Sequence, residues 1–175
     1  LWWELKNTGI GAGENLMKVS TPNSSVIWIT SGATGVYRSI DAGQTFTKVL
    51  TDSDIDEPLA LDANTAWAMC NFSLYKTTNG GANWTTQTID SWPDKNAICA
   101  ADANTLYCAG WEGAIWKTTN GGTTWTKVRI ETMNQQFGNI AAASASVVYV
   151  CGQEGASSIT GAPVIYKTTD GGTTW

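Results

Sequence analysis

Apolar and polar side chains alternate along several short stretches of the chain. The clearest examples are residues 26–30, 65–69 and 147–151, each built from β-branched, aromatic or small apolar residues. A period of two residues predicts half-buried β-strands. No segment keeps the 3.6-residue period and the caps of an amphipathic helix. We therefore expect an all-β protein.

The chain repeats one pattern four times. The pattern is Ser/Thr-x-Asp/Asn-x-Gly-x-x-Trp/Phe, and an aromatic residue and a base precede each copy. The final aromatic residues are separated by 38, 41 and 50 residues, and Trp3 lies 43 residues before the first of them in the same phase. A period near 40 residues combined with strand alternation is typical of four-stranded blades. The copies occupy residues 39–46, 77–84, 118–125 and 168–175.

Each repeat is predicted to contain four strands. The link 102–104 reads as a tight turn between the first two strands of the third repeat, and Asn120-Gly121-Gly122 reads as a hairpin, because Asn and Gly accept a positive φ. The strands expected in that repeat lie at about 97–101, 105–109, 114–118 and 125–129. We expect one domain or propeller segment with repeat units at about 4–46, 47–84, 85–125 and 126–175.

The four segments resemble the Asp-box, also called the bacterial neuraminidase repeat. The version at 117–125, Lys-Thr-Thr-Asn-Gly-Gly-Thr-Thr-Trp, is most similar to the repeats of photosystem II stability and assembly factors. The resemblance covers essentially the whole chain. It implies a β-propeller, or a segment of one, with about four four-stranded antiparallel blades. Each Asp-box would lie on the hairpin between strands three and four of its blade.

The residues of the box predict a structural role. The Asp or Asn side chain can accept hydrogen bonds from backbone N–H groups of the turn, the Gly takes a backbone angle closed to other residues, and the aromatic residue packs between sheets. We therefore expect these residues to fasten hairpins and bind nothing. They are Asp41, Gly43 and Phe46; Asn79, Gly81 and Trp84; Asn120, Gly122 and Trp125; and Asp170, Gly172 and Trp175.

The two ends of the chain occupy the same point of the repeat, at Trp3 and Trp175. Residues 3–6 have the pattern of an outer strand without a blade, and the fourth repeat lacks its outer strand. One interpretation is a four-bladed ring that residues 3–6 close. The other is a window on a longer array whose ends continue or pair with neighbouring chains, which the six or more blades of known Asp-box propellers favour. An unpaired edge strand would invite aggregation.

Composition excludes several classes of function. The chain has no His, which removes imidazole catalysis and His metal sites. Ten Lys and Arg against 15 Asp and Glu leave a net charge of −5, so we expect neither nucleic acid nor an anionic membrane as a partner. No apolar run is long enough for a membrane span, and nothing indicates a cofactor.

Two tryptophans lie in links that we expect on one face of the blades. The links between strands two and three, and between blades, are longer and more variable than the turns opposite, and binding sites usually lie on such loops. Trp92 lies in Ser91-Trp92-Pro93 and Trp111 in Gly110–Gly113. Exposed, they would offer flat apolar surfaces to a sugar or a protein anchor. The alternative is that both shield the core.

The run Asp52-Ser53-Asp54-Ile55-Asp56 spaces its carboxylates like the start of a calcium loop. Glu57 stands where an EF-hand needs Gly, and Pro58 follows. A solvated acidic loop therefore fits better than a Ca²⁺ site at Asp52, Asp54 and Asp56.

Cys99 and Cys108 would face each other if the turn between their strands centred between Ala103 and Asn104. That register allows a cross-strand disulfide, with a pair of small apolar thiols as the alternative.

Enzymatic activity is not expected. Sialidases with this repeat clamp their substrate with three arginines, whereas the chain has only Arg38 and Arg129. A glycosidase needs two carboxyl groups at a set separation, and no pair can be assigned here.

We therefore expect a non-catalytic structural or protein-interaction module, secreted or on a surface, whose partner is a protein, including copies of itself. The alternatives are a carbohydrate-binding propeller using Trp92 and Trp111, and a fragment of an Asp-box glycosidase. The resemblance to assembly factors also implies a chaperone-like role in photosystem biogenesis. The scarcity of Arg offers such a role no obvious basic docking patch.

Overall fold

The computed structural model describes residues 2–70, 73–89, 95–129, 135–155 and 161–175. These residues form β-strands connected by turns and loops. No helix among them is long and apolar enough to cross a membrane. The chain divides into two compact units: unit 1 contains residues 1–70 and 74–86, and unit 2 contains residues 71–73 and 87–175.

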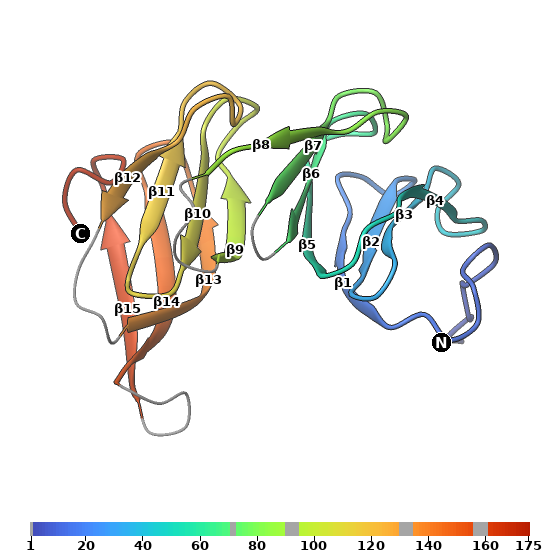
Figure 1. Cartoon of the computed structure of the whole chain (residues 1–175), viewed down its shortest axis with the longest axis horizontal. Coiled ribbons are helices and arrows are strands. Elements are labelled where there is room, and N and C mark those ends of the chain that lie inside the picture. The colour runs from blue at the N-terminus through green and yellow to red at the C-terminus, as the bar shows by residue number, and fades with distance from the viewer. Residues whose placement is uncertain (1, 71–72, 90–94, 130–134, 156–160) are drawn as a thin grey trace. The chain divides into compact units, whose positions relative to one another are not determined.

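Unit 1 contains two four-stranded sheets whose strands pair in chain order, as Figure 1 shows. Each strand therefore lies beside the next one along the chain. The first sheet consists of β1 (Leu16–Ser20), β2 (Ile27–Ser31), β3 (Gly35–Ser39) and β4 (Thr47–Leu50). The second consists of β5 (Ile55–Ala60), β6 (Ala66–Cys70), β7 (Leu74–Thr77) and β8 (Thr85–Gln87).

Unit 2 continues the same topology. Its first sheet has four strands and its second has three among the described residues. The first consists of β9 (Lys95–Ala100), β10 (Leu106–Gly110), β11 (Ile115–Thr118) and β12 (Thr126–Arg129). The second consists of β13 (Gln135–Ala142), β14 (Val148–Glu154) and β15 (Ala162–Thr168).

The predicted all-β fold is confirmed. The strands expected in the third repeat match β9 to β12 within two residues at their ends. Each sheet runs through its strands in chain order, and three of the four have four strands, which is the blade topology that the repeat predicted.

Each unit buries apolar side chains between its two sheets. In unit 1, Trp28 is fully buried and meets Trp84 edge to face, with ring centroids 6.0 Å apart. In unit 2, Tyr107 and Phe137 are fully buried in the corresponding cluster. Large aromatic residues fill these interfaces because every second strand position points at the neighbouring sheet. The sheets are thereby held face to face as consecutive blades.

The predicted opposition of Cys99 and Cys108 is wrong. Cys99 pairs with Tyr107 and Cys108 with Ile98, so the register differs by one residue from the predicted one. The Asp102 carboxylate accepts the N–H groups of Asn104 and Thr105, at 2.8 Å each, which widens the turn and centres it on Ala103. A shift of one residue sends a strand side chain to the other face. The two sulfurs thus point to opposite faces, and no disulfide joins them.

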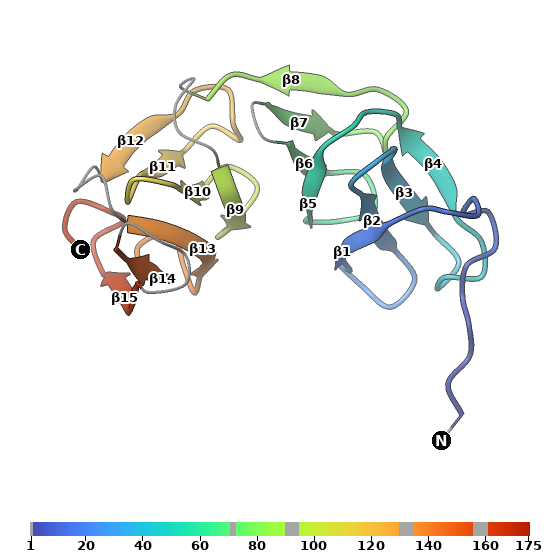
Figure 2. The ribbon, with the colours of Figure 1, turned by 60° about the horizontal axis from the view of Figure 1, so that its bottom comes forward.

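Residues 2–15 precede β1 and form no strand, although residues 3–6 have the pattern of one. Trp2 and Trp3 are fully exposed. Lys6 nevertheless lies against the first Asp-box, where a Cβ on Gly43 would be 3.7 Å from its own Cβ. In Figure 2 the segment approaches the first sheet near β4 before the chain enters β1.

Candidate functional site

A hydroxyl group organises each Asp-box. In the third box, the Thr118 hydroxyl donates to Asn120 Oδ1 at 2.9 Å and accepts the Gly122 N–H at 3.0 Å. Asn120 Oδ1 also accepts the Thr124 N–H at 2.9 Å. Two side chains therefore satisfy backbone groups that the hairpin leaves without ladder partners. The same network recurs in the boxes that begin at Ser39, Thr77 and Thr168.

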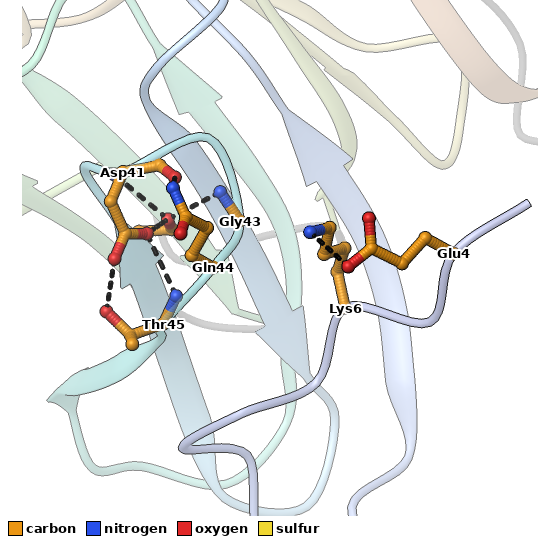
Figure 3. A network of polar contacts seen from close by, with 7 residues as sticks. Glu4, Lys6, Asp41, Gly43, Gln44 and Thr45 are labelled. Carbon is orange, nitrogen blue, oxygen red and sulfur yellow. Dashed lines mark hydrogen bonds and ion pairs between the residues drawn. The ribbon is translucent and has the colours of Figure 1, made fainter.

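In the two boxes that carry Asp, the carboxylate also accepts a Thr hydroxyl, whereas in the third box Asn120 Nδ2 donates to the Thr124 hydroxyl at 2.8 Å. In the first box, shown in Figure 3, Thr45 donates its N–H to Asp41 Oδ1 at 2.9 Å and its hydroxyl to Oδ2 at 2.6 Å. Asp170 receives the same pair of bonds from Thr174. The side-chain and backbone hydrogen bonds from Thr45 and Thr174 lower the pKa of Asp41 and Asp170 to about 2. Both carboxylates are committed to the hairpin.

A base on the third strand lies over an aromatic ring on the second in every sheet. Each base pairs across the ladder with the aromatic residue that it covers. Such cross-strand cation–π pairs stabilise neighbouring strands. The pairs are Arg38 over Trp28 (5.2 Å from cation to ring centroid), Lys76 over Trp67 (5.2 Å), Lys117 over Tyr107 (5.4 Å) and Lys167 over Tyr149 (5.3 Å).

Within each unit, this base also reaches the Asp-box of the following sheet. Arg38 donates to the carbonyl oxygen of Gly80 at 3.2 Å, and Lys117 donates to that of Gly171 at 2.9 Å. Both carbonyls belong to the residue directly after the box Asp or Asn. The motif indicated only that each box holds its own hairpin together. In the structure, the second and fourth boxes also accept a hydrogen bond from the base of the preceding sheet.

The box glycine completes this contact. A Cβ on Gly81 would lie 2.6 Å from the Val49 Cβ, and one on Gly172 would lie 3.1 Å from Val128 Cγ2. Trp84 adds a hydrogen bond from its Nε1 to the carbonyl oxygen of Val49, at 2.8 Å. The box Gly is thus required for close packing on the outer strand of the preceding sheet as well as for its positive φ.

Acidic residues in the links are held by tyrosine hydroxyls. The Glu14 carboxylate accepts Ser31 Oγ and Tyr37 Oη, each at 2.6 Å, and also Thr34 Oγ1 and Lys48 Nζ. These hydrogen bonds, that of Ser31 first, lower the pKa of Glu14 to about 2. The carboxylate fastens residues 9–15 to β2, β3 and β4, a role that no local pattern of residues indicated.

Asp52, Asp54 and Asp56, the calcium candidates, engage separate partners. Asp52 accepts the Tyr75 hydroxyl, a bond that raises the pKa of Tyr75 to about 12. Asp54 has a φ of 63° and donates its N–H to the Gly32 carbonyl, and Asp56 lies in β5. Among the described residues, no three Asp, Glu, Cys or His side chains gather in a way that could hold a metal ion.

Arg38 and Arg129 both serve the packing of their own units. Arg129 is buried, stacks on the Tyr166 ring at 4.0 Å from its centroid, and donates to Gln135 Oε1 at 3.1 Å. Gln135 in turn donates to the Tyr166 hydroxyl. Neither arginine is left to clamp a substrate carboxylate in the manner of a sialidase.

Trp111 lies on a tight turn between β10 and β11. Glu112 and Gly113 both have positive φ, at 57° and 65°, and the Ala114 N–H closes the turn on the Trp111 carbonyl at 3.2 Å. An isolated antiparallel bridge joins Trp111 to Gln136 of β13, and the Trp111 side chain is 43% exposed. The turn therefore presents the ring to solvent from a fixed backbone. Trp92, the other candidate, lies outside the described residues.

A pocket of about 200 Å³ includes the strand ends next to this turn. Its wall contains the amides of Asn96, Gln136 and Gln153, together with the bulge at Gly138. Asn96 Nδ2 donates to the Phe137 carbonyl at 3.0 Å. Among the residues that the structure describes, no charged side chain lines the pocket. The arrangement can pair hydrogen-bond donors and acceptors with a neutral polar group.

A larger cleft, of about 440 Å³, lies in unit 2 beside the fourth Asp-box. Threonine side chains dominate its wall, and the ammonium group that reaches it, from Lys117, is bonded to the Gly171 carbonyl. None of the described residues that line the cleft carries a carboxyl group, so these residues do not supply the acid pair of a glycosidase. The cleft thus lies where Lys117 contacts the fourth Asp-box.

Sheets with four strands in chain order, fastened at repeated Asp-boxes, define the chain as an Asp-box β-propeller protein. Residues 60–175 match the family described as photosynthesis system II assembly factor YCF48, and the chain belongs to this family. The resemblance that the repeats indicated is therefore confirmed.

Solved structures of this architecture are similar to the chain over most of its length. They include YCF48 bound to a D1 peptide (13% identity, 93% of this chain and 81% of that chain, TM-score 0.60). YCF48 from Cyanidioschyzon merolae is similar over 93% of this chain and 71% of that chain (16% identity, TM-score 0.61). A GH74 enzyme from Niastella koreensis is similar over 93% of this chain but 29% of its own (19% identity, TM-score 0.67). These identities show a shared fold alone. No curated protein matched the sequence.

The expected extracellular or surface location is wrong. The family consists of photosystem II assembly factors, and such homologues belong to the cyanobacterial cytoplasm or the thylakoid lumen. The expectation rested on low charge and abundant Trp, Thr and Gly. The paired blades account for the abundance of Trp, Thr and Gly, because Trp fills the sheet interfaces and Gly and Thr build the boxes.

Proposed function

We propose that the chain is a non-catalytic module that binds a peptide segment of another protein. The observation that carries this proposal is the family match over residues 60–175, which includes three of the four Asp-boxes. A member of the family has been solved with a D1 peptide. A photosystem subunit is accordingly the partner that we propose for this chain.

The peptide site that we propose is the loop end of unit 2, at Trp111 and the adjacent amide pocket. Trp111 offers a flat, half-exposed ring on a rigid turn, a common anchor in protein interfaces. The side-chain amides of Asn96, Gln136 and Gln153 carry the same donor and acceptor groups as a peptide bond. Trp92, on another link predicted on this face, is proposed as a second anchor.

The test is the binding of a fluorescent D1-derived peptide, followed by anisotropy. We expect saturable binding to the wild-type chain, and a dissociation constant raised roughly tenfold by Trp111→Ala. Trp2→Ala removes an equally large exposed ring from unit 1 and serves as the matched control. Equal affinity for a scrambled peptide, or no binding at all, would contradict the proposal.

The carboxyl groups support a role without catalysis. A glycosidase needs a general acid whose pKa is raised. Hydrogen bonds instead lower the pKa of Glu14, Asp41, Asp62, Asp102 and Asp170. Those carboxylates hold links and turns in place.

Carbohydrate binding is a second candidate, which the neutral amide pocket beside Trp111 favours, because sugar hydroxyl groups use the same donors and acceptors. A glycan array probed with the wild-type chain and with Trp92→Ala and Trp111→Ala tests it. Binding that both substitutions abolish would support this candidate over the peptide, and an empty array would remove it. We also propose a second copy of the chain as a partner, because the apolar side chains of Leu16, Val19 and Ile165 are exposed on their strands.

A further inference from the structure

Two dipeptides in the Asp-boxes carry a chemical reactivity that their structural role does not use. The sequence Asn-Gly occurs twice in the chain, at residues 79–80 and 120–121, and each copy lies inside a box. Asn is among the thermolabile residues. It reacts fastest before Gly, because Gly has no side chain to hinder the approach of its own backbone nitrogen. Each copy is therefore a candidate site of deamidation.

The reaction needs only these two residues and water. In the third box, the backbone nitrogen of Gly121 would attack Cγ of Asn120, and the bond from Cγ to Nδ2 would break. The departing amide nitrogen takes up the proton of the Gly121 N–H and leaves as ammonia. Water then opens the five-membered imide at one of its two carbonyl carbons. The product is Asp or isoaspartate, and either one adds a negative charge to the chain.

In the folded box, the attacking nitrogen is engaged in a hydrogen bond. The Gly80 N–H donates to the carbonyl oxygen of Asn64 at 2.9 Å, and the Gly121 N–H donates to that of Asn104 at 2.9 Å. Both acceptors lie in the turn between the first two strands of the same sheet. The equivalent N–H makes the same bond in all four boxes. The glycine nitrogen must give up this bond before it can lose its proton and attack.

The side-chain amide that would be attacked is held as well. Asn120 Oδ1 accepts the Thr118 hydroxyl and the Thr124 N–H, each at 2.9 Å. Asn120 Nδ2 donates to the Thr124 hydroxyl at 2.8 Å. The amide oxygen of Asn79 accepts the two equivalent hydrogen bonds in the second box. Because these bonds fix the amide to the hairpin, Cγ can turn toward the glycine nitrogen only after they break.

We propose that Asn79 and Asn120 are deamidation sites that the folded Asp-box keeps inactive and that local opening of the box exposes. The rate at each site is then the intrinsic rate of Asn-Gly multiplied by the fraction of time that its box is open. The two sites lie in different units, so each reports the opening of its own unit. The first and fourth boxes carry Asp at this position, so the Asp product fits the hairpin. Converted chains therefore accumulate as a record of past opening.

Peptide mapping by mass spectrometry tests the proposal. The wild-type chain is kept with and without urea in a mildly alkaline buffer, in which base removes the proton from the attacking nitrogen. Trypsin releases the two sites in separate peptides, residues 77–95 and 118–127, and fragmentation assigns each conversion to its Asn. We expect both sites to react roughly tenfold or more slowly in the native buffer than in urea. Equal rates in the two buffers would overturn the proposal.

Thr118→Val weakens the third box without altering its Asn-Gly sequence. The substitution removes the donor to Asn120 Oδ1 and the acceptor of the Gly122 N–H, so conversion of Asn120 in native buffer should rise roughly tenfold. Asn79 lies in the other unit and should keep its wild-type rate. Thr119→Val, at the neighbouring exposed position, is the matched control and should leave both rates unchanged. An unchanged rate at Asn120 in Thr118→Val would contradict protection by the box.

Hydrogen exchange on the wild-type chain keeps the proposal testable even if Thr118→Val does not fold. The N–H groups of Gly80 and Gly121 are the donors whose release the reaction requires. Relative to the urea-unfolded chain, we expect their exchange to be slowed by about the same factor as deamidation of the preceding Asn. Rapid exchange of either N–H beside a slowly reacting Asn would show that opening of the box does not limit the reaction.

Discussion

At the scale of single residues, the hydroxyl at the start of each Asp-box is as central as the Asp or Asn for which the motif is named. Ser39, Thr77, Thr118 and Thr168 each accept the N–H of the box glycine and donate to the box acid or amide. The pattern required Ser or Thr at this position but did not tell what the hydroxyl binds. An oxygen that both donates and accepts is what the tight hairpin needs.

Thr118→Val tests this role, because it keeps the shape of the side chain and removes the hydroxyl. The buried N–H of Gly122 then has no acceptor, and we expect the free energy of unfolding to fall by ~1–3 kcal/mol. Urea denaturation followed by tryptophan fluorescence measures the change. Thr123→Val, on an exposed position of the same hairpin, should change stability far less. Equal effects of the two substitutions would argue against the hydroxyl as the organising group.

The two Asp-containing boxes predict a pH dependence at acid pH. Because the folded-state pKa of Asp41 and Asp170 is lowered to about 2, below the ordinary value of 3.8, their charged form stabilises the fold above pH 4. That contribution is lost as the pH falls from about 4 to about 2. The double variant Asp41→Asn, Asp170→Asn should therefore be less stable than the wild type at pH 7 and approach it near pH 2. A constant difference over this range, in denaturation at each pH, would refute the explanation.

At the scale of elements, two contacts join neighbouring sheets within a unit. The base on the third strand donates a hydrogen bond to the Asp-box of the next sheet, and a valine on the outer strand packs against the glycine of that box. Lys117 and Val128 make these two contacts to the fourth box, and Arg38 and Val49 make them to the second. The residues that form the hairpin of an Asp-box are therefore also the residues that contact the preceding sheet. A substitution in one box should weaken both.

Gly81→Ala tests the close contact between sheets. Alanine in the left-handed region costs about 1–2 kcal/mol, and its Cβ would also lie 2.6 Å from the Val49 Cβ. We expect a loss of at least ~2 kcal/mol in the free energy of unfolding. Gly138→Ala is the control, since a Cβ there meets nothing within 4 Å. If both variants unfold at the same denaturant concentration, the glycine is not required for packing.

At the scale of the whole molecule, the absence of His leaves no imidazole to titrate near neutral pH. The resolved shifts of the carboxyl groups are all downward, so these groups stay charged above pH 5 in both the folded and the unfolded state. We expect the melting temperature to stay within about 3 °C between pH 5 and 8. Calorimetry across this range measures it, and a steep dependence of the melting temperature on pH would show that a further group titrates with folding.

Much of the fold could be predicted from the sequence, because the same pattern of strands and turns occurs four times along the chain. The strands of the third repeat and the place of its box on a hairpin were predictable from alternation and from Asn-Gly-Gly. The register at Cys99 was not, since Asp102 recruits two N–H groups and moves the turn by half a residue. The hydrogen bonds to the Glu14 carboxylate were also not predictable, because Ser31, Tyr37 and Lys48 come from three strands and form no local pattern.

The sequence by itself determined the all-β class, the repeat, the hairpins and the family, because these depend on local geometry that recurs in phase. Only the tertiary structure decided which atoms join one sheet to the next, since Arg38 and Gly80 are 42 positions apart in the chain. It also brought Trp111 next to Gln136 and left the faces around Val19 and Ile165 exposed. Such pairings arise from packing between distant segments, and a one-dimensional pattern does not encode them.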